Sequence, residues 1–318
     1  MTSAPLTIAT TFEPGLVARL RAHPTAPEVW SFPIGRKTWL VPPSADVLFT
    51  YARDFVGFPV EPPPGWPFSL RWIQIATTGV DAFPDWLFVG PPVTCGRHIA
   101  SENIAEFVLA LLLQDEKRLD SLRITSRAGW HKPPIGTLSG RTVGLLGGGA
   151  IGQAVARRLT GFGTRIVGLR NRPPSSDAGE IIEWQPSLEA LMRQSDHLIV
   201  ALPQTSLTQN ILNRRSLAWA KPGLHLVNVS RGGLIDNNAL LEALDAGFVR
   251  RASLDVTMPE PLPEGHPFYT HSKVFLTPHQ SWYSDDYEDR IWAKVSDNLQ
   301  RFVDGRELRD VVIPERGY

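Results

Sequence analysis

The sequence has little cysteine, no net charge and no long hydrophobic run. Its single cysteine, Cys95, excludes an internal disulfide and a cysteine-rich metal site, as is typical of a protein from a reducing cytosol. We expect Cys95 to be a small buried core residue and not a nucleophile. The 32 basic residues balance 32 acidic residues without forming a basic stripe, so a nucleic-acid partner is not expected.

Export and membrane signals are also missing. Residues 1–12 lack the basic start and long apolar core of a signal peptide. The longest apolar run, residues 107–113, is far short of the ~20 residues that cross a bilayer. These absences predict a cytoplasmic protein without a membrane partner. What is present is a chain of 318 residues, 42% of them hydrophobic, which is typical of about two globular domains.

Hydrophobic patterning separates the first hundred residues from the remainder of the chain. Residues 1–100 alternate short apolar runs with proline-rich turns and indicate a small α/β unit, with strands at 46–49 and 72–75. Residues 101–119 carry apolar side chains at helical spacing and predict a helix. The high apolar content of this helix fits either simple core packing or burial between domains or subunits.

From residue 141 onward, predicted strands alternate with predicted helices. This order predicts a parallel, doubly wound sheet with right-handed crossovers, whose ligands gather at the carboxyl ends of the strands. The expected strands are 142–146, 165–169, 197–202, 224–229, 252–256 and 274–277, and the expected helices are 188–193, 239–246 and 286–303. The apolar residues 311–313 can pack back on the first domain.

A glycine motif, G-x-G-x-x-G, lies between the strand at 142–146 and a following amphipathic segment. Gly147 allows a tight turn, Gly149 lets the backbone approach a pyrophosphate, and Gly152 lets the helix pack on the strand. The amino terminus of the helix then faces the phosphates. In this strand–turn–helix context, the motif predicts a dinucleotide site near the middle of the chain.

Polar residues follow three later strands. Arg231 follows the strand at 224–229, Asp255 and Glu260 lie at and after the next strand, and His279 follows the last strand. Because the carboxyl ends of parallel strands meet at one edge of a sheet, these side chains are well placed to converge on the cofactor. Each residue alone could be structural, but the ordered set favours catalysis.

The chemistry that fits this set is hydride transfer to a carbonyl. The carbonyl oxygen gains charge and needs a proton, which a histidine can supply near neutral pH. A carboxylate beside the histidine fixes its tautomer, and an arginine can bind a substrate carboxylate with two parallel hydrogen bonds.

These motifs resemble the D-isomer-specific 2-hydroxyacid dehydrogenase family over residues 45–303. The resemblance implies a Rossmann-type dinucleotide-binding domain, residues 102–284, inserted into a smaller flavodoxin-like α/β substrate domain, residues 1–101 and 285–318. It also implies an NAD(P)-dependent oxidoreductase that interconverts a small 2-oxo acid and its D-2-hydroxy acid, with a reductase for glyoxylate or hydroxypyruvate as the first candidate. Members of the family are typically homodimers through the cofactor domain, and the helix at 101–119 fits that contact.

The resemblance also assigns site residues by position. His279 would be the general acid/base with Glu260 as its partner, and Arg231 would anchor the substrate carboxylate. The backbone amides of Thr77, Thr78, Gly79 and Val80 would bind the same carboxylate. The residues that would contact the cofactor are Gly147, Gly149, Ala150, Ile151, Gly152, Leu202, Pro203, Val229, Ser230, Asp255 and His279, with Asp255 near the nicotinamide carboxamide.

The cofactor choice depends on the segment after the strand at 165–169. An NAD site normally has an acidic residue about 20 residues past the glycines, which accepts hydrogen bonds from the ribose hydroxyls. Here Arg170, Asn171 and Arg172 stand in that place. Two arginines suit a 2′-phosphate, so the sequence favours NADP(H) over NAD(H), although both could be solvated strand-end charges.

Alternatives remain at the level of function. A formate dehydrogenase pairs its histidine with glutamine, so Glu260 argues against that activity. A nucleotide-sensing, corepressor-like binding protein on the same fold can retain the catalytic set and stays open. No H-x-x-x-H or Cys/His cluster is present, so we expect no metal. Trp282 and Tyr283 could line or cover the site, or pack between the domains.

Overall fold

The computed structural model describes residues 5–32, 41–171 and 181–316. The chain divides into a smaller unit, residues 1–100 with 284–318, and a larger unit, residues 101–283. Among the described residues, no helix is both long and apolar enough to cross a membrane. The smaller unit is therefore assembled from both ends of the chain, and each unit is described by itself.

The described residues of the smaller unit form a parallel five-stranded sheet with the order β2-β1-β3-β4-β5. This is the flavodoxin-like order expected from the resemblance. The strands are β1 (Thr7–Thr10), β2 (Glu28–Ser31), β3 (Val47–Thr50), β4 (Trp72–Ile75) and β5 (Val93–Thr94). The helices are α1 (Pro14–Arg21) and α8 (Tyr287–Val303), with 3₁₀ helices at Ala52–Phe55, Asp85–Phe88 and Pro314–Arg316.

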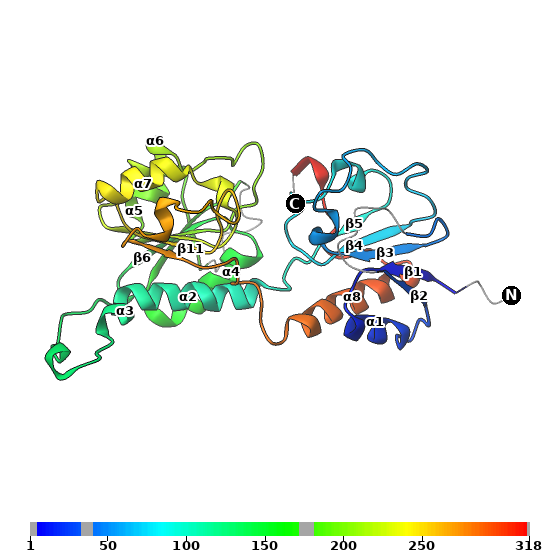
Figure 1. Ribbon diagram of the computed structural model, residues 1–318, viewed down its shortest axis with the longest axis horizontal. Coiled ribbons are helices and arrows are strands. Elements are labelled where there is room, and N and C mark those ends of the chain that lie inside the picture. Colours follow the sequence, from blue (N-terminus) through cyan, green and yellow to red (C-terminus); the bar gives the residue numbers. More distant parts are fainter. Residues whose placement is uncertain (1–4, 33–40, 172–180, 317–318) are drawn as a thin grey trace. The chain divides into compact units, whose positions relative to one another are not determined.

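The carboxyl-terminal helix α8 completes the core of the smaller unit. Ile291, Val295 and Leu299 recur every four residues, so they form one apolar stripe along the helix. This stripe packs in one cluster with Phe49 and Trp72 of the sheet. Figure 1 shows α1 and α8 on the same side of this sheet. The apolar residues near the carboxyl terminus, Val311 and Val312, also pair with the sheet of the smaller unit.

Backbone pairing joins the carboxyl-terminal residues to strand β5. The amide of Val312 donates to the carbonyl of Val93 over 2.8 Å, and Thr94 forms an antiparallel bridge with Val311. Cys95 beside them is fully buried, as the sequence predicts, and burial raises the pKa of its thiol.

The described residues of the larger unit form a parallel seven-stranded sheet with the order β12-β11-β10-β9-β6-β7-β8. Six of these strands have the Rossmann order 3-2-1-4-5-6 if β6 is counted as the first strand, and β12 extends the sheet at one edge. The strands are β6 (Thr142–Leu146), β7 (Arg165–Leu169), β8 (Glu183–Trp184), β9 (His197–Val200), β10 (Leu224–Asn228), β11 (Val249–Leu254) and β12 (Val274–Leu276).

Helices cover both faces of this sheet. Figure 1 shows α5, α6 and α7 on one face and α2 with α4 on the other. The helices are α2 (Ser101–Lys117), α3 (Leu119–Leu122), α4 (Ala150–Leu159), α5 (Leu188–Gln194), α6 (Arg214–Leu217) and α7 (Asn237–Asp245), with 3₁₀ helices at Arg127–Gly129, Thr160–Phe162, Gly232–Leu234 and Pro267–Tyr269. The predicted helix at 101–119 ends at Lys117, because Arg118 takes a left-handed conformation with φ 51°.

The last turn of α2 carries two buried carboxylates, which its apolar pattern does not predict. Asp115 accepts two hydrogen bonds from Arg250, at 2.7 and 2.6 Å. Glu116 contacts Arg141 at 3.1 Å and His197 at 3.1 Å. Nearby, burial lowers the pKa of His225 to about 3, so this side chain is uncharged at neutral pH.

Candidate active site and dinucleotide site

The glycine turn between β6 and α4 has the backbone that a dinucleotide requires. Gly147 adopts φ 122°, and a Cβ there would lie 2.5 Å from the carbonyl oxygen of Ala201. A Cβ on Gly152 would lie 2.2 Å from the carbonyl oxygen of Gly147, so the first helical turn packs directly on the glycine turn. A Cβ on Gly149, by contrast, would meet nothing within 4 Å. The open space over Gly149, at the start of α4, fits a phosphate group.

Arg170 lies beside this turn and stacks on an aromatic ring. Its guanidinium carbon lies 3.9 Å from the centroid of the Trp184 ring. Trp184 in turn packs against Gly148, where an added Cβ would lie 2.5 Å from the indole. The stacking fixes the plane of a cation at the carboxyl end of β7. Asn171 follows as an exposed residue, whereas Arg172 lies outside the described residues.

The segments after β9 and β10 are joined by a hydrogen bond. The hydroxyl of Ser230 donates to the carbonyl of Leu202, and Pro203 follows Leu202. Within the described chain, the side-chain oxygen of the neighbouring Gln204 is buried without a hydrogen-bond partner. Such an orphaned acceptor fits a site that binds a polar ligand. Val229 is buried directly before Ser230.

Arg231 follows β10 and is held by its backbone neighbours. Its carbonyl accepts a hydrogen bond from the side-chain amide of Asn228 at 2.9 Å. The guanidinium donates to the carbonyl of Ser230 at 2.8 Å. A Cβ on the next residue, Gly232, would lie 1.9 Å from the carbonyl carbon of Thr257, so only glycine lets these two loops approach. The close approach brings the loop of Arg231 beside the segment that leads to Glu260.

His279 and Glu260 form a direct pair. The Nδ1 atom of His279 lies 2.7 Å from Oε1 of Glu260, and the two side chains are 37% and 43% exposed. With Nδ1 bonded to the carboxylate, Nε2 is the ring atom left to face a reactant. His279 adopts φ 52°, a conformation that non-glycine residues avoid unless their surroundings hold it.

Asp255 stabilises this backbone conformation of His279. Its carboxylate is 1% exposed and accepts hydrogen bonds from the Thr277 hydroxyl at 2.7 Å, the Gln280 amide at 2.9 Å and the Ser281 amide at 3.0 Å. Its carbonyl accepts a further hydrogen bond from the amide of His279 at 2.8 Å. One buried carboxylate therefore fastens the loop on both sides of His279. The resemblance places Asp255 at the nicotinamide, whereas the contacts within the chain give it this loop-fastening function.

Trp282 also supports the histidine loop. Its indole N–H donates to the carbonyl of His279 at 2.8 Å, and its ring lies edge-on to Tyr283 with centroids 5.1 Å apart. Tyr283 is 57% exposed within the chain.

In the smaller unit, residues 77–80 form a loop directly after β4. The Thr77 hydroxyl donates to the carbonyl of Gly79 at 3.0 Å, and the Thr78 hydroxyl donates to the carbonyl of Gly96 at 3.1 Å. Both threonine side chains thus stabilise the loop itself. None of the four backbone amides donates a hydrogen bond to another described residue. The loop therefore has amides available for an anion.

Sequence reasoning missed two residues of the candidate dinucleotide site. Trp184 belongs to the two-residue strand β8, which is too short to show a hydrophobic period. The one available signal was its position in the sequence, shortly after Arg170, Asn171 and Arg172. Gln204 directly follows Leu202 and Pro203, which the resemblance assigns to the cofactor, but the burial of its side-chain oxygen without a hydrogen-bond partner is evident only in the structure.

Comparison with known proteins identifies the family. The model of the D-isomer specific 2-hydroxyacid dehydrogenase NAD-binding domain matches residues 109–281, more than half of the chain. The chain belongs to this family. The match contains the glycine turn, Arg231, Glu260 and His279, so the expected dinucleotide-binding domain and Rossmann-type fold are confirmed.

The chain matches different fractions of the lengths of its relatives. A glyoxylate/hydroxypyruvate reductase A from Serratia proteamaculans is 32% identical over 219 residues, which cover 66% of this chain and 70% of the relative. A D-3-phosphoglycerate dehydrogenase from Mycobacterium leprae is 33% identical over 218 residues, 68% of this chain but only 41% of the relative. The chain thus spans less than half the length of that dehydrogenase.

A solved structure resembles nearly the whole chain. It is a D-isomer specific 2-hydroxyacid dehydrogenase from Xanthobacter autotrophicus in complex with NADPH and MES. The TM-score is 0.83 at 26% identity, and the similarity covers 99% of this chain and 100% of that chain.

Proposed function

We propose that this dehydrogenase is a reductase that converts a small 2-oxo acid of the glyoxylate or hydroxypyruvate type to its 2-hydroxy acid, with the D configuration where a stereocentre forms. The observation that carries the proposal is the His279–Glu260 pair, at 2.7 Å, beside the loop of Arg231 and in the same unit as the glycine turn. A proton donor, its carboxylate partner and a carboxylate-binding arginine are the groups that reduction of a 2-oxo acid requires. Similarity to a glyoxylate/hydroxypyruvate reductase supports the substrate class.

The larger unit would bind the dinucleotide, which supplies the hydride when it is bound. Gly147, Gly149 and Gly152 would hold the pyrophosphate at the start of α4, together with the amides of Ala150 and Ile151. The remaining contacts would come from the strand-end residues Leu202, Pro203, Val229, Ser230 and Asp255. The open space at Gly149 and the orphaned oxygen of Gln204 support this assignment.

The proton would come from His279. Because Glu260 accepts the hydrogen bond from Nδ1–H, Nε2 of the protonated ring is the donor to the oxygen of the substrate. Glu260 keeps the ring oriented in both protonation states. Arg231 would bind the substrate carboxylate. The amides of residues 77–80 in the smaller unit are further proposed donors to a carboxylate.

NADP(H) is the proposed cofactor. Its 2′-phosphate needs cations at the carboxyl end of β7, where NAD(H) sites carry an acidic residue. Arg170, stacked on Trp184, stands there, followed by Asn171 and Arg172. The solved relative with bound NADPH supports this choice. We also propose a homodimer through the larger unit, since Phe107, Leu109 and Leu113 of α2 stay partly exposed in the single chain.

Steady-state kinetics on a panel of 2-oxo acids, each with NADPH and NADH, tests the proposal. The expected result is turnover of glyoxylate or hydroxypyruvate with a higher kcat/KM for NADPH. Equal or better use of NADH refutes the cofactor preference alone. Negligible turnover of every acid would refute the reductase proposal. If the protein also bound a partner in a manner that depends on NADP(H), the nucleotide-sensing, corepressor-like function would be favoured instead.

A further inference from the structure

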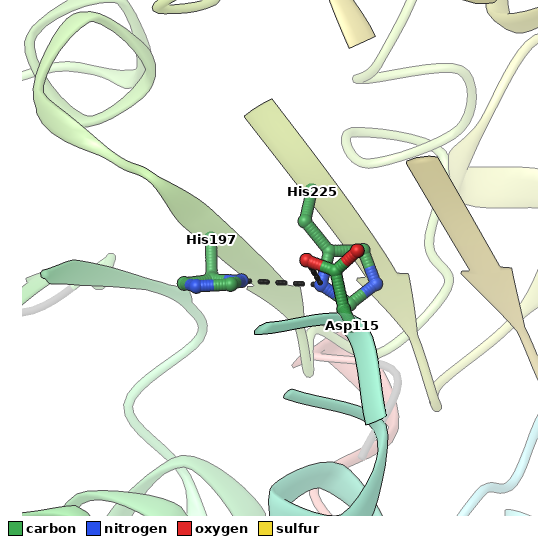
Figure 2. A group of neighbouring side chains, drawn as sticks. All are labelled: Asp115, His197 and His225. Atoms are coloured by element: carbon green, nitrogen blue, oxygen red, sulfur yellow. Dashed lines mark hydrogen bonds and ion pairs between the residues drawn. The ribbon is translucent and has the colours of Figure 1, made fainter. Parts of the chain in front are cut away.

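Two buried histidines and a buried aspartate meet at the amino edge of the seven-stranded sheet, opposite the edge that carries Arg231 and His279. His197 is the first residue of β9, His225 is the second residue of β10, and Asp115 lies in the last turn of α2. The two histidines are directly opposite each other in the strand register, so their side chains share one face. Figure 2 shows both rings and the aspartate pointing toward a common centre.

The spacing of the facing atoms matches a metal site. The two Nδ1 atoms are 3.1 Å apart, and Nδ1 of His225 is 3.4 Å from Oδ2 of Asp115. Each of the three residues offers one ligand atom, and these three atoms lie within 4.8 Å of one another. Ligands of tetrahedral zinc at ~2.0–2.1 Å from the metal lie roughly 3.3 Å from each other. The separations of 3.1 and 3.4 Å therefore already fit such a site.

Each of the three side chains is also oriented by a partner behind it. His197 is bonded through Nε2 to Glu116 at 3.1 Å, and His225 is bonded through Nε2 to the Ser253 hydroxyl at 2.9 Å. Arg250 holds both oxygens of Asp115. Metal-binding histidines almost always donate their second N–H to such an acceptor, and a carboxylate in this position is common in zinc sites. The outer hydrogen bonds of a metal site are thus already in place.

We propose that Asp115, His197 and His225 bind one divalent transition-metal ion, with zinc as the best match to two imidazoles and a carboxylate. The ion ties α2 to β9 and β10, distant from the reductase chemistry. In the metal-free chain the two Nδ1 atoms share a proton instead. The Ser253 hydroxyl both donates and accepts, so His225 can take the tautomer that either state needs.

A pocket of about 260 Å³ reaches this cluster on the side of Asp115. Its charged lining consists of three carboxylates and three guanidinium groups: Asp115, Glu116, Asp196, Arg118, Arg141 and Arg250. The pocket is large enough for water, which supplies the ligand that three protein groups leave open. The side chains of Arg141 and Arg250 are 42% and 46% exposed, so water screens the repulsion between their charges and the ion.

Calorimetric titration of Zn²⁺ into the full chain tests the proposal. The protein is first treated with a chelator and carries no histidine tag. We expect one ion per chain. Asp115→Asn and His225→Gln should each weaken binding by more than about tenfold, because even outer hydrogen-bond partners are worth ~10–100-fold in affinity. Glu116→Gln should weaken binding within that range. The control is His271→Gln, which alters another histidine–carboxylate pair of the same unit and should bind as the wild type does.

A second measurement avoids the risk that a core variant fails to fold. Co²⁺ added to the wild-type protein should give the strong visible absorption of a four-coordinate ion with nitrogen and oxygen ligands, and Zn²⁺ should displace it. Weak absorption typical of a six-coordinate ion, or no uptake of either ion, overturns the proposal. Folded variants of Asp115 and His225 that bind like the wild type also overturn it.

Discussion

Removal of the Asp255 carboxylate offers the sharpest test of how the chain positions His279. Its three hydrogen bonds, at 2.7, 2.9 and 3.0 Å, hold residues on both sides of the histidine, and the carboxylate is 1% exposed. Asp255→Ala leaves the Gln280 and Ser281 amides without this acceptor, whereas the Thr277 hydroxyl can rotate elsewhere. An unsatisfied buried donor costs ~1–3 kcal/mol, so the two amides together predict a loss of about 2–6 kcal/mol in the free energy of unfolding.

Asp255→Asn should cost less. The remaining carbonyl oxygen of the side chain still accepts one amide, and the new NH₂ group cannot accept the other, which predicts a loss of about 1–3 kcal/mol. Both variants should also lower kcat, because the same loop holds His279 at φ 52°. The control is Asp245→Ala, since Asp245 is 77% exposed and its pair with His271 is a surface contact worth about 0–1 kcal/mol.

Urea unfolding followed by circular dichroism measures the global effect. Amide hydrogen exchange of the peptide that contains Gln280 and Ser281 measures the local effect, which matters if the loop opens without global unfolding. The reasoning is refuted if Asp255→Ala leaves the unfolding free energy within about 1 kcal/mol of the wild type and leaves exchange of these two amides unchanged.

Four further outcomes are expected. His279→Ala should reduce kcat by about 10²–10⁴, the range for a lost general acid, and full turnover in stopped-flow assays would remove His279 from the mechanism. Arg231→Lys should raise KM for the 2-oxo acid, because lysine lacks the planar fork of donors; an unchanged KM would assign the substrate carboxylate to another group. Trp184→Leu should raise KM for NADPH more than KM for NADH, because Arg170 loses its stacking surface, and an equal effect on both would contradict a 2′-phosphate contact. Burial lowers the pKa of His23, so the wild type should lose stability as pH falls below ~6.5, by at most about 1.4 kcal/mol per pH unit from this group; urea titrations from pH 7 to 5 should show a shallower slope for His23→Gln, and parallel slopes would count against this effect.

The strand-end chemistry could be predicted from the sequence because it is local. Gly147, Gly149 and Gly152 lie within one turn, and their conformations follow from the absence of a side chain. Arg231 and His279 each follow a strand of the same parallel sheet, and parallel strands end at one edge. The strands β1, β2, β5 and β8 and the helix α1 were not predicted, and the two-residue strands β5 and β8 are too short to show a period.

The buried polar cluster could not be predicted, for the opposite reason. Asp115, His197 and His225 lie 28 to 110 positions apart along the chain, and the two histidines stand in otherwise apolar strands. The pattern of a helix depends only on residues near one another along the chain, so it does not show that β9 and β10 bring two histidines to the last turn of α2. The contacts of Asp255 with the His279 loop could not be predicted for the same reason, because its hydrogen-bond partners follow a different strand, β12.

The division of the smaller unit between the two ends of the chain has a consequence during synthesis. Ile291, Val295 and Leu299 of α8 pack in the same cluster as Phe49 and Trp72, so the first hundred residues leave the ribosome without part of their core. The ribosome must then translate residues 101–283, at ~5–20 residues per second, before the missing helix emerges. The larger unit is contiguous, so its core is complete at the end of this interval of about 10–40 s, before α8 has emerged. The nascent amino-terminal segment exposes an apolar sheet face for the same time, and this face is where a chaperone would bind.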